Sequence, residues 1–447
     1  MIYILFDILI LTIIGVSFKN FGIGYLLALC SYMVIPSMVR IQLGGIAFSI
    51  VDVIPLSFFL SFLVNRRLIK NGIKFPKKLK LYFYISIIST FILILFSSGF
   101  VPIQTQFINL FKYVIQTILF LYLGYYAFYS LDKRLALNIL LYCSILCGLY
   151  GILTYFLHTN PYINSLYLFY TGEENIYMAF QESIRGALEG RVSGTNVHPL
   201  GWGQMWNVLL PFFIIVRKDC NRILFSFVIL IGVINIVLCG SRSALIGFLL
   251  FLLFFLFFEK KSTALKYTLV GFGFLLLTFA VFDNYRPINQ MKEYLISSIA
   301  FWDTEKQSQM DIKGSSMEMR LEQFDVATKI AFKNLGGEGY GYKLYSLQHY
   351  SQYNSDLYGL ESFVIRELVE KGWLGLICFL WMFYLLYSYA ISEVNAQDKY
   401  KWFAYFISFF ICILMTDIQG ISWTLFFLLI LLNKVSKRNY LIKNTAI

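Results

Sequence analysis

Long apolar runs separated by short polar segments dominate the chain. They cover residues 2–18, 21–38, 51–64, 81–98, 107–129, 135–157, 200–216, 223–239, 243–258, 267–282, 372–391, 402–416 and 422–433. Each run is close to the roughly 20 residues with which a helix crosses a bilayer. The pattern predicts an all-α, polytopic membrane protein with about 12 or 13 transmembrane helices, residues 1–447 forming a single membrane domain. The lower count applies if one of the first three runs is re-entrant or interfacial.

Composition agrees with this class. The chain is 58% hydrophobic and only 14% charged, whereas soluble domains carry about 25% charged residues. The runs are continuous rather than alternating, which argues against a transmembrane β-barrel. The N-terminus lacks a basic region before its first apolar run, so we expect that run to be a span rather than a cleaved signal peptide.

The net charge of +12 lies mostly in short loops, which indicates membrane orientation rather than nucleic-acid binding. Basic residues gather at 65–80, 131–134, 217–222, 259–266 and 434–444. The positive-inside rule makes these segments cytoplasmic. Alternation along the chain then places 158–199, 240–242, 283–371 and 417–421 outside.

Two of these outer segments, 158–199 and 283–371, are unusually long, and loops of that size are commonly functional. In the longer one, apolar residues from Met317 to Leu335 recur at helical spacing. Ser315 and Glu318 fit a capping box, and two glycines follow Leu335 as a helix stop. A second helix, 360–376, is expected to run straight into the next span. We therefore predict that 283–371 forms a helical cap over a site, with 158–199 contributing a second outer loop.

Three arginines mark the outer boundary. Arg191 opens the polar stretch RVSGTNVHPLG, whose Gly194 permits close backbone approach; Arg242 begins a span in GSRSALIG; Arg320 lies on the predicted helix of the long loop. Guanidinium groups bind phosphate in a bidentate manner, and helix starts favour anions. If the three meet in space, they predict a cradle for a lipid-linked phosphate or pyrophosphate. Singly, each is also compatible with a helix-terminal or snorkelling arginine.

Candidate acid–base residues are few. Glu361 shares a helical face with Ile365 and Leu368, and partial burial there would raise its pKa and suit it to general-base work. A salt-bridged structural glutamate is the alternative. His349 and His198 are reserve candidates, because both lie in predicted polar outer segments.

Glycines alternate at Gly337, Gly339 and Gly341 in LGGEGYGYK. No βαβ unit surrounds them, so they are not a dinucleotide fingerprint. They indicate a tight turn whose backbone approaches a ligand or another helix. The outer segments contain no metal-binding spacing, and the seven cysteines suggest neither a disulfide framework nor a zinc site. We predict that the protein uses no metal and no cofactor.

The order of these motifs resembles the O-antigen polymerase and O-antigen ligase superfamily of integral membrane glycosyltransferases. The resemblance covers about residues 185–380 and rests on GRVSGTNVHPLG, GSRSALIG, MRLEQF, LGGEGYG and ESFVIRELVEKGWLG. It implies metal-independent, inverting transfer of glycan from undecaprenyl pyrophosphate to an acceptor hydroxyl, on the outer side of the bacterial cytoplasmic (inner) membrane. It further implies that Arg191, Arg242 and Arg320 hold the pyrophosphate and that Glu361 activates the acceptor.

Ligases of this superfamily carry a His-Asn pair where this chain has Glu361 and Ser362, which favours a polymerase of O-antigen, capsular or exopolysaccharide repeat units. Donor and acceptor would then both be undecaprenyl-pyrophosphate-linked oligosaccharides in the lipid membrane, and the family adds a possible chain-length regulator. A ligase is the first alternative. A lipid-linked oligosaccharide transporter or flippase is the second, although no internal repeat is visible and Lys112 is the clearest charge inside a span. A non-catalytic assembly subunit is the third.

Overall fold

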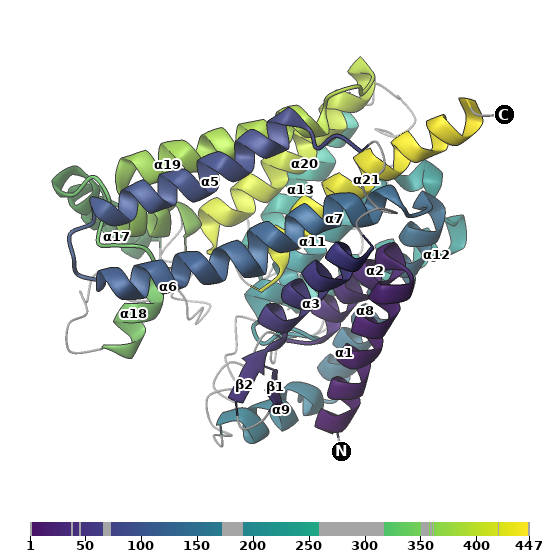
Figure 1. Ribbon diagram of the computed structural model, residues 1–447, viewed down its shortest axis with the longest axis horizontal. Helices are drawn as coiled ribbons and strands as arrows, with labels where there is room; N and C mark the ends of the chain where they lie inside the picture. Colours follow the sequence, from purple (N-terminus) through teal and green to yellow (C-terminus); the bar gives the residue numbers. More distant parts are fainter. Residues whose placement is uncertain are drawn as a thin grey trace, which may run out of the picture.

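The computed structural model describes residues 2–36, 39–43, 46–65, 73–171, 191–258, 317–349, 357, 360, 362–418 and 420–445. These residues are almost entirely helical, which confirms the predicted all-α membrane class (Figure 1). The hydropathy pattern did not predict one short antiparallel hairpin of β1 (Arg40–Leu43) and β2 (Ile46–Ser49). It lies between two of the first apolar helices.

The helices follow the apolar runs closely. They are α1 (Ile2–Lys19), α2 (Phe21–Val34), α3 (Ile50–Val64), α5 (Lys77–Leu95), α6 (Ile103–Tyr113), the π-helix η1 (Val114–Leu119), α7 (Phe120–Tyr129), α8 (Lys133–Phe156), α9 (Pro161–Thr171), α11 (Pro199–Ile215), the 3-10 helix η2 (Arg217–Asp219), α12 (Arg222–Leu238), α13 (Arg242–Phe258), α17 (Met317–Lys333), α18 (Tyr342–Gln348), α19 (Phe363–Ala390), α20 (Ala396–Met415) and α21 (Ser422–Thr445). A helix occupies every predicted span except 267–282, which lies outside the described residues.

Four of the described helices are long and apolar enough to cross a membrane: Lys77–Leu95, Ile103–Tyr129, Lys133–Phe156 and Phe363–Ala390. Five shorter apolar helices accompany them. Large apolar side chains face outward, with Leu146 69% and Phe257 75% exposed. Water would penalise such a surface, and lipid would not. A polytopic membrane protein follows, while the number of about 12 or 13 spans stays a prediction.

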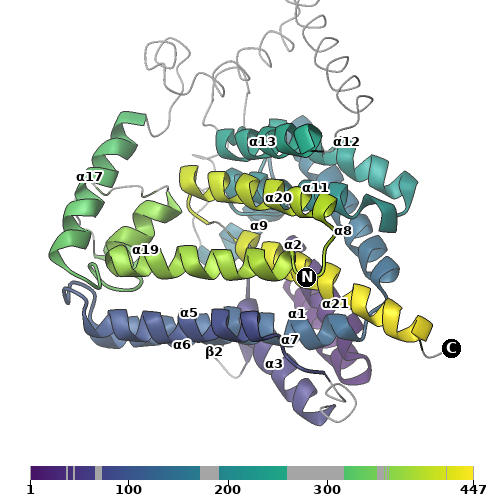
Figure 2. The same cartoon turned by 90° about the horizontal axis from the view of Figure 1, so that it is seen from above.

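The long helices lie side by side in layers. In Figures 1 and 2, α13, α20, α19 and α5 run in nearly the same direction, and α17 crosses the beginning of α19 at one end. The segment α6–η1–α7 continues beside α5 and reaches α21. Helix α11 is buried between α12, α13, α20 and α21, and helices α1, α2, α3 and α8 pack beside them.

Segments predicted to lie outside contact one another at one end of the helices, which we call the outer end. There Lys343 Nζ and Arg366 Nη1, from the segment 283–371, each lie 2.8 Å from the carboxylate of Asp417, in the segment 417–421. At the opposite, inner end, Lys133 pairs with Asp219. The loops that the positive-inside rule assigns to opposite sides of the membrane therefore lie at opposite ends of the helices.

The helix predicted at 317–335 is present as α17 and stops before the two glycines, as expected. Only part of its apolar stripe is buried, however. Ala327 and Ala331 of the stripe are buried together with Gln323, whereas Leu321 is 59% exposed and Phe324 is also exposed. The small residues are buried because α17 packs closely against α19.

The expectation of an uninterrupted helix over 360–376 was wrong. Helix α19 changes direction at Gly372, where φ is 63° and ψ is −169°. A Cβ at this position would lie 2.5 Å from the carbonyl oxygen of Leu335, in the turn after α17. Only glycine accepts both the positive φ and the close backbone contact. The kink separates a short outer segment, 363–371, from the remainder of α19.

Candidate functional site

Arg191 and Arg242 lie at the same turn, between α12 and α13. The Arg191 side chain is buried, and its Nε donates to the carbonyl of Cys239 at 3.1 Å. Gly240, with φ of 62°, passes so close that a Cβ there would be 3.2 Å from that Nε. Arg242 is the first residue of α13 and is half-buried. The fold thus brings together two of the three predicted arginines.

Hydroxyl groups connect this turn to the link between α20 and α21. Ser241 and Ser243, on either side of Arg242, have their Oγ atoms 3.2 Å apart. Thr416 Oγ1 donates to Ser243 Oγ at 2.6 Å. The next residue, Asp417, accepts a bond from Gln204 Nε2 through its carbonyl at 2.7 Å. A continuous polar path therefore runs beneath the outer end.

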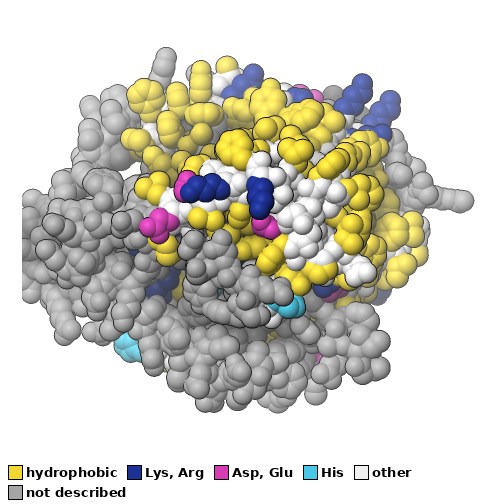
Figure 3. Space-filling model, turned by 90° about the vertical axis from the view of Figure 1, so that its left-hand side faces the viewer, with side chains coloured by type: hydrophobic (Ala, Val, Ile, Leu, Met, Phe, Trp, Pro, Cys, Tyr) yellow, Lys and Arg dark blue, Asp and Glu magenta, His cyan; other side chains and the backbone are white. Residues whose placement is uncertain are grey.

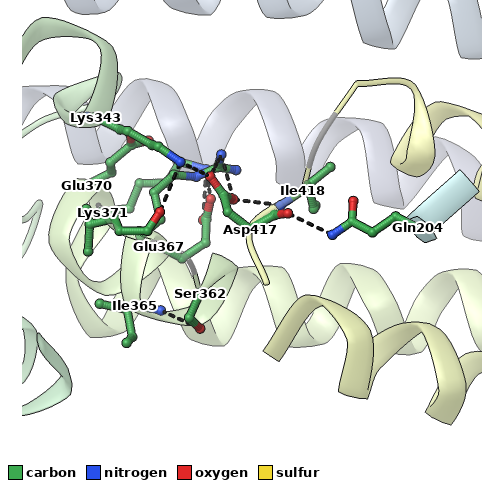
Figure 4. A network of polar contacts seen from close by, with 11 residues as sticks. Gln204, Lys343, Ser362, Ile365, Glu367, Glu370, Lys371, Asp417 and Ile418 are labelled. Carbon is green, nitrogen blue, oxygen red and sulfur yellow. Dashed lines mark hydrogen bonds and ion pairs between the residues drawn. The ribbon is translucent and has the colours of Figure 1, made fainter. Parts of the chain in front are cut away.

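Asp417 is the centre of the densest charge pairing at this end (Figure 4). Its buried carboxylate lies 2.8 Å from Arg366 Nη1 and 2.8 Å from Lys343 Nζ. The backbone N–H of Ile418 also donates to it, at 2.7 Å. A carboxylate removed from water needs this degree of compensation. Asp417 thereby joins α18, α19 and the α20–α21 link.

Two further carboxylates on α19 complete a charged cluster, whose members are Lys343, Arg366, Glu367, Glu370, Lys371 and Asp417. Glu370 is buried and accepts a bond from the backbone N–H of Lys343 at 3.2 Å. Lys371 Nζ lies 3.1 Å and 2.9 Å from the two carboxylate oxygens of Glu367. Three cations and three carboxylates thus interlock in the outer segment of α19 and the elements around it.

A cavity of about 570 Å³ borders this cluster, between α5, α6–η1, α19 and the beginning of α21. Its volume lies in the range of about 300–1,000 Å³ that ligand pockets occupy. Tyr340 lines it, and desolvation, aided by Tyr113 and Glu370, raises the pKa of this phenol well above its ordinary value. The phenol therefore stays protonated at neutral pH and can donate a hydrogen bond. Figure 3 shows this end of the molecule, with charged side chains set among uncharged polar surface and bordered by hydrophobic residues.

The three alternating glycines bring their turn against neighbouring helices. Gly337, Gly339 and Gly341 have φ of 65°, 113° and 89°. A Cβ on Gly337 would lie 2.3 Å from the carbonyl oxygen of Val369, and one on Gly339 would lie 2.7 Å from Gln106 Nε2. Of the two predicted uses of this turn, approach to another helix is the one that the contacts show.

Gly194 and His198 serve local structure. Gly194 has φ of 52°, and a Cβ there would lie 2.4 Å from the ring of Trp202. His198 caps the N-terminus of α11, because its Nδ1 accepts from the backbone N–H of Leu200 at 3.1 Å. Both residues therefore help to fix the segment that carries Arg191.

The remaining candidates lie on other elements. Arg320 is half-buried on α17, which Figures 1 and 2 show at a distance from α13. His349 is exposed at the end of α18, where its ring stacks on Tyr345 at 4.1 Å between centroids. Glu361 lies outside the described residues. Ser362, which follows it, caps α19. The structure therefore brings Arg191 and Arg242 to one turn and leaves Arg320 on a third element, α17.

Sequence reasoning missed the charged cluster. It assigned Arg366 and Asp417 to the outer side but did not pair them, because they are 51 residues apart along the chain. The available signal was that a carboxylate directly after a span, in an outer link of a few residues, needs a cation nearby.

Comparison with known proteins agrees with the motif order. A family model described as O-antigen ligase matches residues 226–380. This range contains Arg242, Arg320, the glycine turn and the outer segment of α19, and it supports the O-antigen ligase and polymerase superfamily. Members of this family are membrane glycosyltransferase-like enzymes. No curated protein matches the chain.

Proposed function

We propose, on the premise of that superfamily, that the protein polymerises undecaprenyl-pyrophosphate-linked oligosaccharide repeat units on the outer side of the bacterial cytoplasmic membrane. The observation that carries this proposal is the meeting of Arg191 and Arg242 at one turn of the outer end. The charged cluster lies at the same end, joined to the turn through Ser243 and Thr416.

The donor pyrophosphate would bind at the α12–α13 turn. The bond from Arg191 Nε to the Cys239 carbonyl fixes the plane of this guanidinium, and planar guanidinium groups pair with phosphate oxygens in a bidentate manner. Arg242 adds its charge at the N-terminus of α13, where the helix dipole also favours an anion. Together they would stabilise the negative charge that grows on the leaving pyrophosphate. Arg320 would approach the same group from the long outer loop.

Transfer itself is a single displacement in this proposal. The acceptor hydroxyl oxygen attacks the anomeric carbon of the donor sugar while the bond from that carbon to the pyrophosphate oxygen breaks. Glu361 takes the hydroxyl proton, and the configuration at the anomeric carbon inverts. His349 and His198 stay reserve bases, although a stacking contact and a helix cap already engage them.

The outer segments 158–199 and 283–371 would cover this chemistry. Helices α17 and α18 supply the described part of the cap, and the glycine turn ties it to α6 and α19. A partner that regulates chain length would act on this side of the membrane.

A ligase is the second candidate, and the description of the matching family favours it. The Glu361–Ser362 pair, in place of His-Asn, favours the polymerase. A transporter or flippase would also bind the pyrophosphate, but the charged groups here gather at the outer end rather than near the midplane of the helices, which favours the enzyme.

A gel profile of surface glycan and of lipid-linked intermediates tests the proposal. A strain lacking the gene would carry wild type, Arg191→Ala or the control Arg222→Ala, which changes an exposed arginine at the inner end. We expect single repeat units in the deletion strain, a full ladder with wild type and with the control, and no ladder with Arg191→Ala at equal protein levels. Accumulation of long lipid-linked polymer in the deletion strain would indicate a ligase. A full ladder with Arg191→Ala would contradict the pyrophosphate site.

A further inference from the structure

Lys112 is a cation on the wall of the cavity opposite the charged cluster. It lies on α6, nine residues after Ile103, which is about 14 Å of helix rise. Among the described residues, no hydrogen bond or ion pair engages its side chain. A charged residue within a predicted span is expensive and commonly marks a binding site. Lys112 is exposed, as a snorkelling lysine would be, but it also lines the cavity and can therefore meet a ligand there.

The other residues on this wall have the chemistry of a sugar site. The amides of Asn109 and Gln116 and the hydroxyls of Ser89 and Thr117 line the cavity, together with the rings of Tyr113 and Trp423. Amides and hydroxyls both donate and accept hydrogen bonds, as sugar hydroxyls require. Aromatic rings offer flat apolar faces to the C–H surfaces of a pyranose. Gln116 and Thr117 belong to the π-helix η1, a rare geometry that is frequent at functional sites.

The charges around the cavity are uneven. Lys112, Lys343, Arg366 and Lys371 line it, against Glu367 and Glu370. Asp417 pairs with Lys343 and Arg366, and Glu367 pairs with Lys371. Glu370 accepts from the backbone N–H of Lys343, and Asp52 accepts from Gln116 one helical turn beyond Lys112, but no ion pair joins Lys112 to a described carboxylate. The ligand that fits best is an oligosaccharide that carries a negative charge.

We propose that this cavity is the acceptor subsite, in which Lys112 faces an anionic group of the incoming oligosaccharide while α5, α6 and η1 bind its sugars. The inference rests on the proposed function, and it places the acceptor on the opposite side of the charged cluster from the donor pyrophosphate. The anion has two possible sources, the pyrophosphate of the acceptor's own lipid carrier and a carboxylate on an acidic sugar.

Binding measurements on the purified full chain in lipid nanodiscs test the proposal. A background with both Arg191→Ala and Arg242→Ala removes the two arginines of the proposed donor turn, so that the remaining binding reports on the acceptor subsite. The probes are a short-chain polyprenyl pyrophosphate without sugar and the repeat-unit oligosaccharide released from its carrier. We expect Lys112→Gln to weaken one probe tenfold or more, as loss of a charge-assisted hydrogen bond does, and Lys112→Arg to retain it. Lys80→Gln, at an exposed lysine of the inner end, is the matched control.

The two probes separate the sources of the anion. Weakened binding of the polyprenyl pyrophosphate identifies the carrier phosphate, and weakened binding of the free oligosaccharide identifies an acidic sugar. Unchanged binding of both probes to a monodisperse Lys112→Gln protein would overturn the subsite. The donor site is tested independently. If Arg191→Ala abolishes polymer while Lys112→Gln behaves like wild type, only the acceptor subsite is rejected. Wild-type polymer with Arg191→Ala rejects the proposed function.

Discussion

The inner and outer ends of the helices both carry charge, but they use it differently. At the inner end, ion pairs are partly open to solvent, as in Lys401 with Asp398, whose carboxylate side chain is 47% exposed. At the outer end, Arg191, Asp417, Glu367 and Glu370 are buried. Charges that only orient a protein in a membrane can remain in water. The buried charges at the outer end are held in mutual pairs, which we propose fix the frame of the binding site.

The largest contrast should come from removing the central carboxylate of each end. Asp417→Ala leaves Arg366 and Lys343 without their shared partner, so we expect a loss of about 3–5 kcal/mol in unfolding free energy and no polymer. Asp219→Ala at the inner end should cost about 1 kcal/mol or less. Thermal unfolding of the purified proteins in the same detergent measures both. Equal losses of unfolding free energy in the two variants would show that the buried and the exposed carboxylate contribute alike to stability.

A substitution that keeps the positive charge but loses the bidentate hydrogen-bonding geometry of arginine separates the two contributions at the outer end. Arg242→Lys retains a cation at the start of α13 but loses the bidentate fork. We expect polymerisation to fall by about 10²–10³, the scale for loss of one transition-state donor, with little change in unfolding temperature. Arg222→Lys should leave activity unchanged. Timed incorporation of labelled repeat units into polymer gives the rates, and wild-type rates for Arg242→Lys would argue against bidentate phosphate binding.

The kink of α19 should show a moderate effect. Gly372→Ala places a methyl group against the Leu335 carbonyl at a positive φ, so we expect destabilisation of about 1–3 kcal/mol. Gly15→Ala on α1 is the control, because nothing lies within 4 Å of a Cβ there. Chemical denaturation monitored by tryptophan fluorescence compares the two. An unaffected Gly372→Ala protein would mean that α19 can straighten.

The smallest effect should come from the exposed side of α17. Leu321→Ser changes an apolar side chain that is mostly exposed, so unfolding free energy should move by only about 0.5 kcal/mol. Ala327→Leu, on the buried side, should be destabilising by about 1–3 kcal/mol because the close contact with α19 has no room for it. If Leu321→Ser proves more destabilising than Ala327→Leu in a melting experiment, the side of α17 that carries Leu321 would be its packing face.

The sequence predicted the helices well because a membrane imposes one strong rule, a long apolar run for each crossing. That Arg191 and Arg242 meet at one turn was an assumption at the level of sequence, made for Arg320 as well, and it depends on how the segment before α11 packs against the α12–α13 turn. The packing face of α17 was predicted only in part: Ala327 and Ala331 of its apolar stripe are buried, but the larger Leu321 and Phe324 are not, because small size matters more than hydrophobicity in the close contact with α19. The pairing of Asp417 with Arg366 depends on how α19 and α20 pack. The role of Glu361 stays a prediction.

The position of Asp417 also has a consequence for how such a protein can change over generations. One carboxylate holds cations from two other segments, so replacing Asp417 strands both cations, whereas replacing Lys343 or Arg366 leaves the carboxylate with one cation. Related chains that handle a different glycan could therefore change either cation singly more readily than they could change the shared carboxylate. The opposite wall of the cavity, formed by α5, α6 and η1, carries no such mutual dependence among its described charged groups. New substrate preferences would arise there first, one residue at a time.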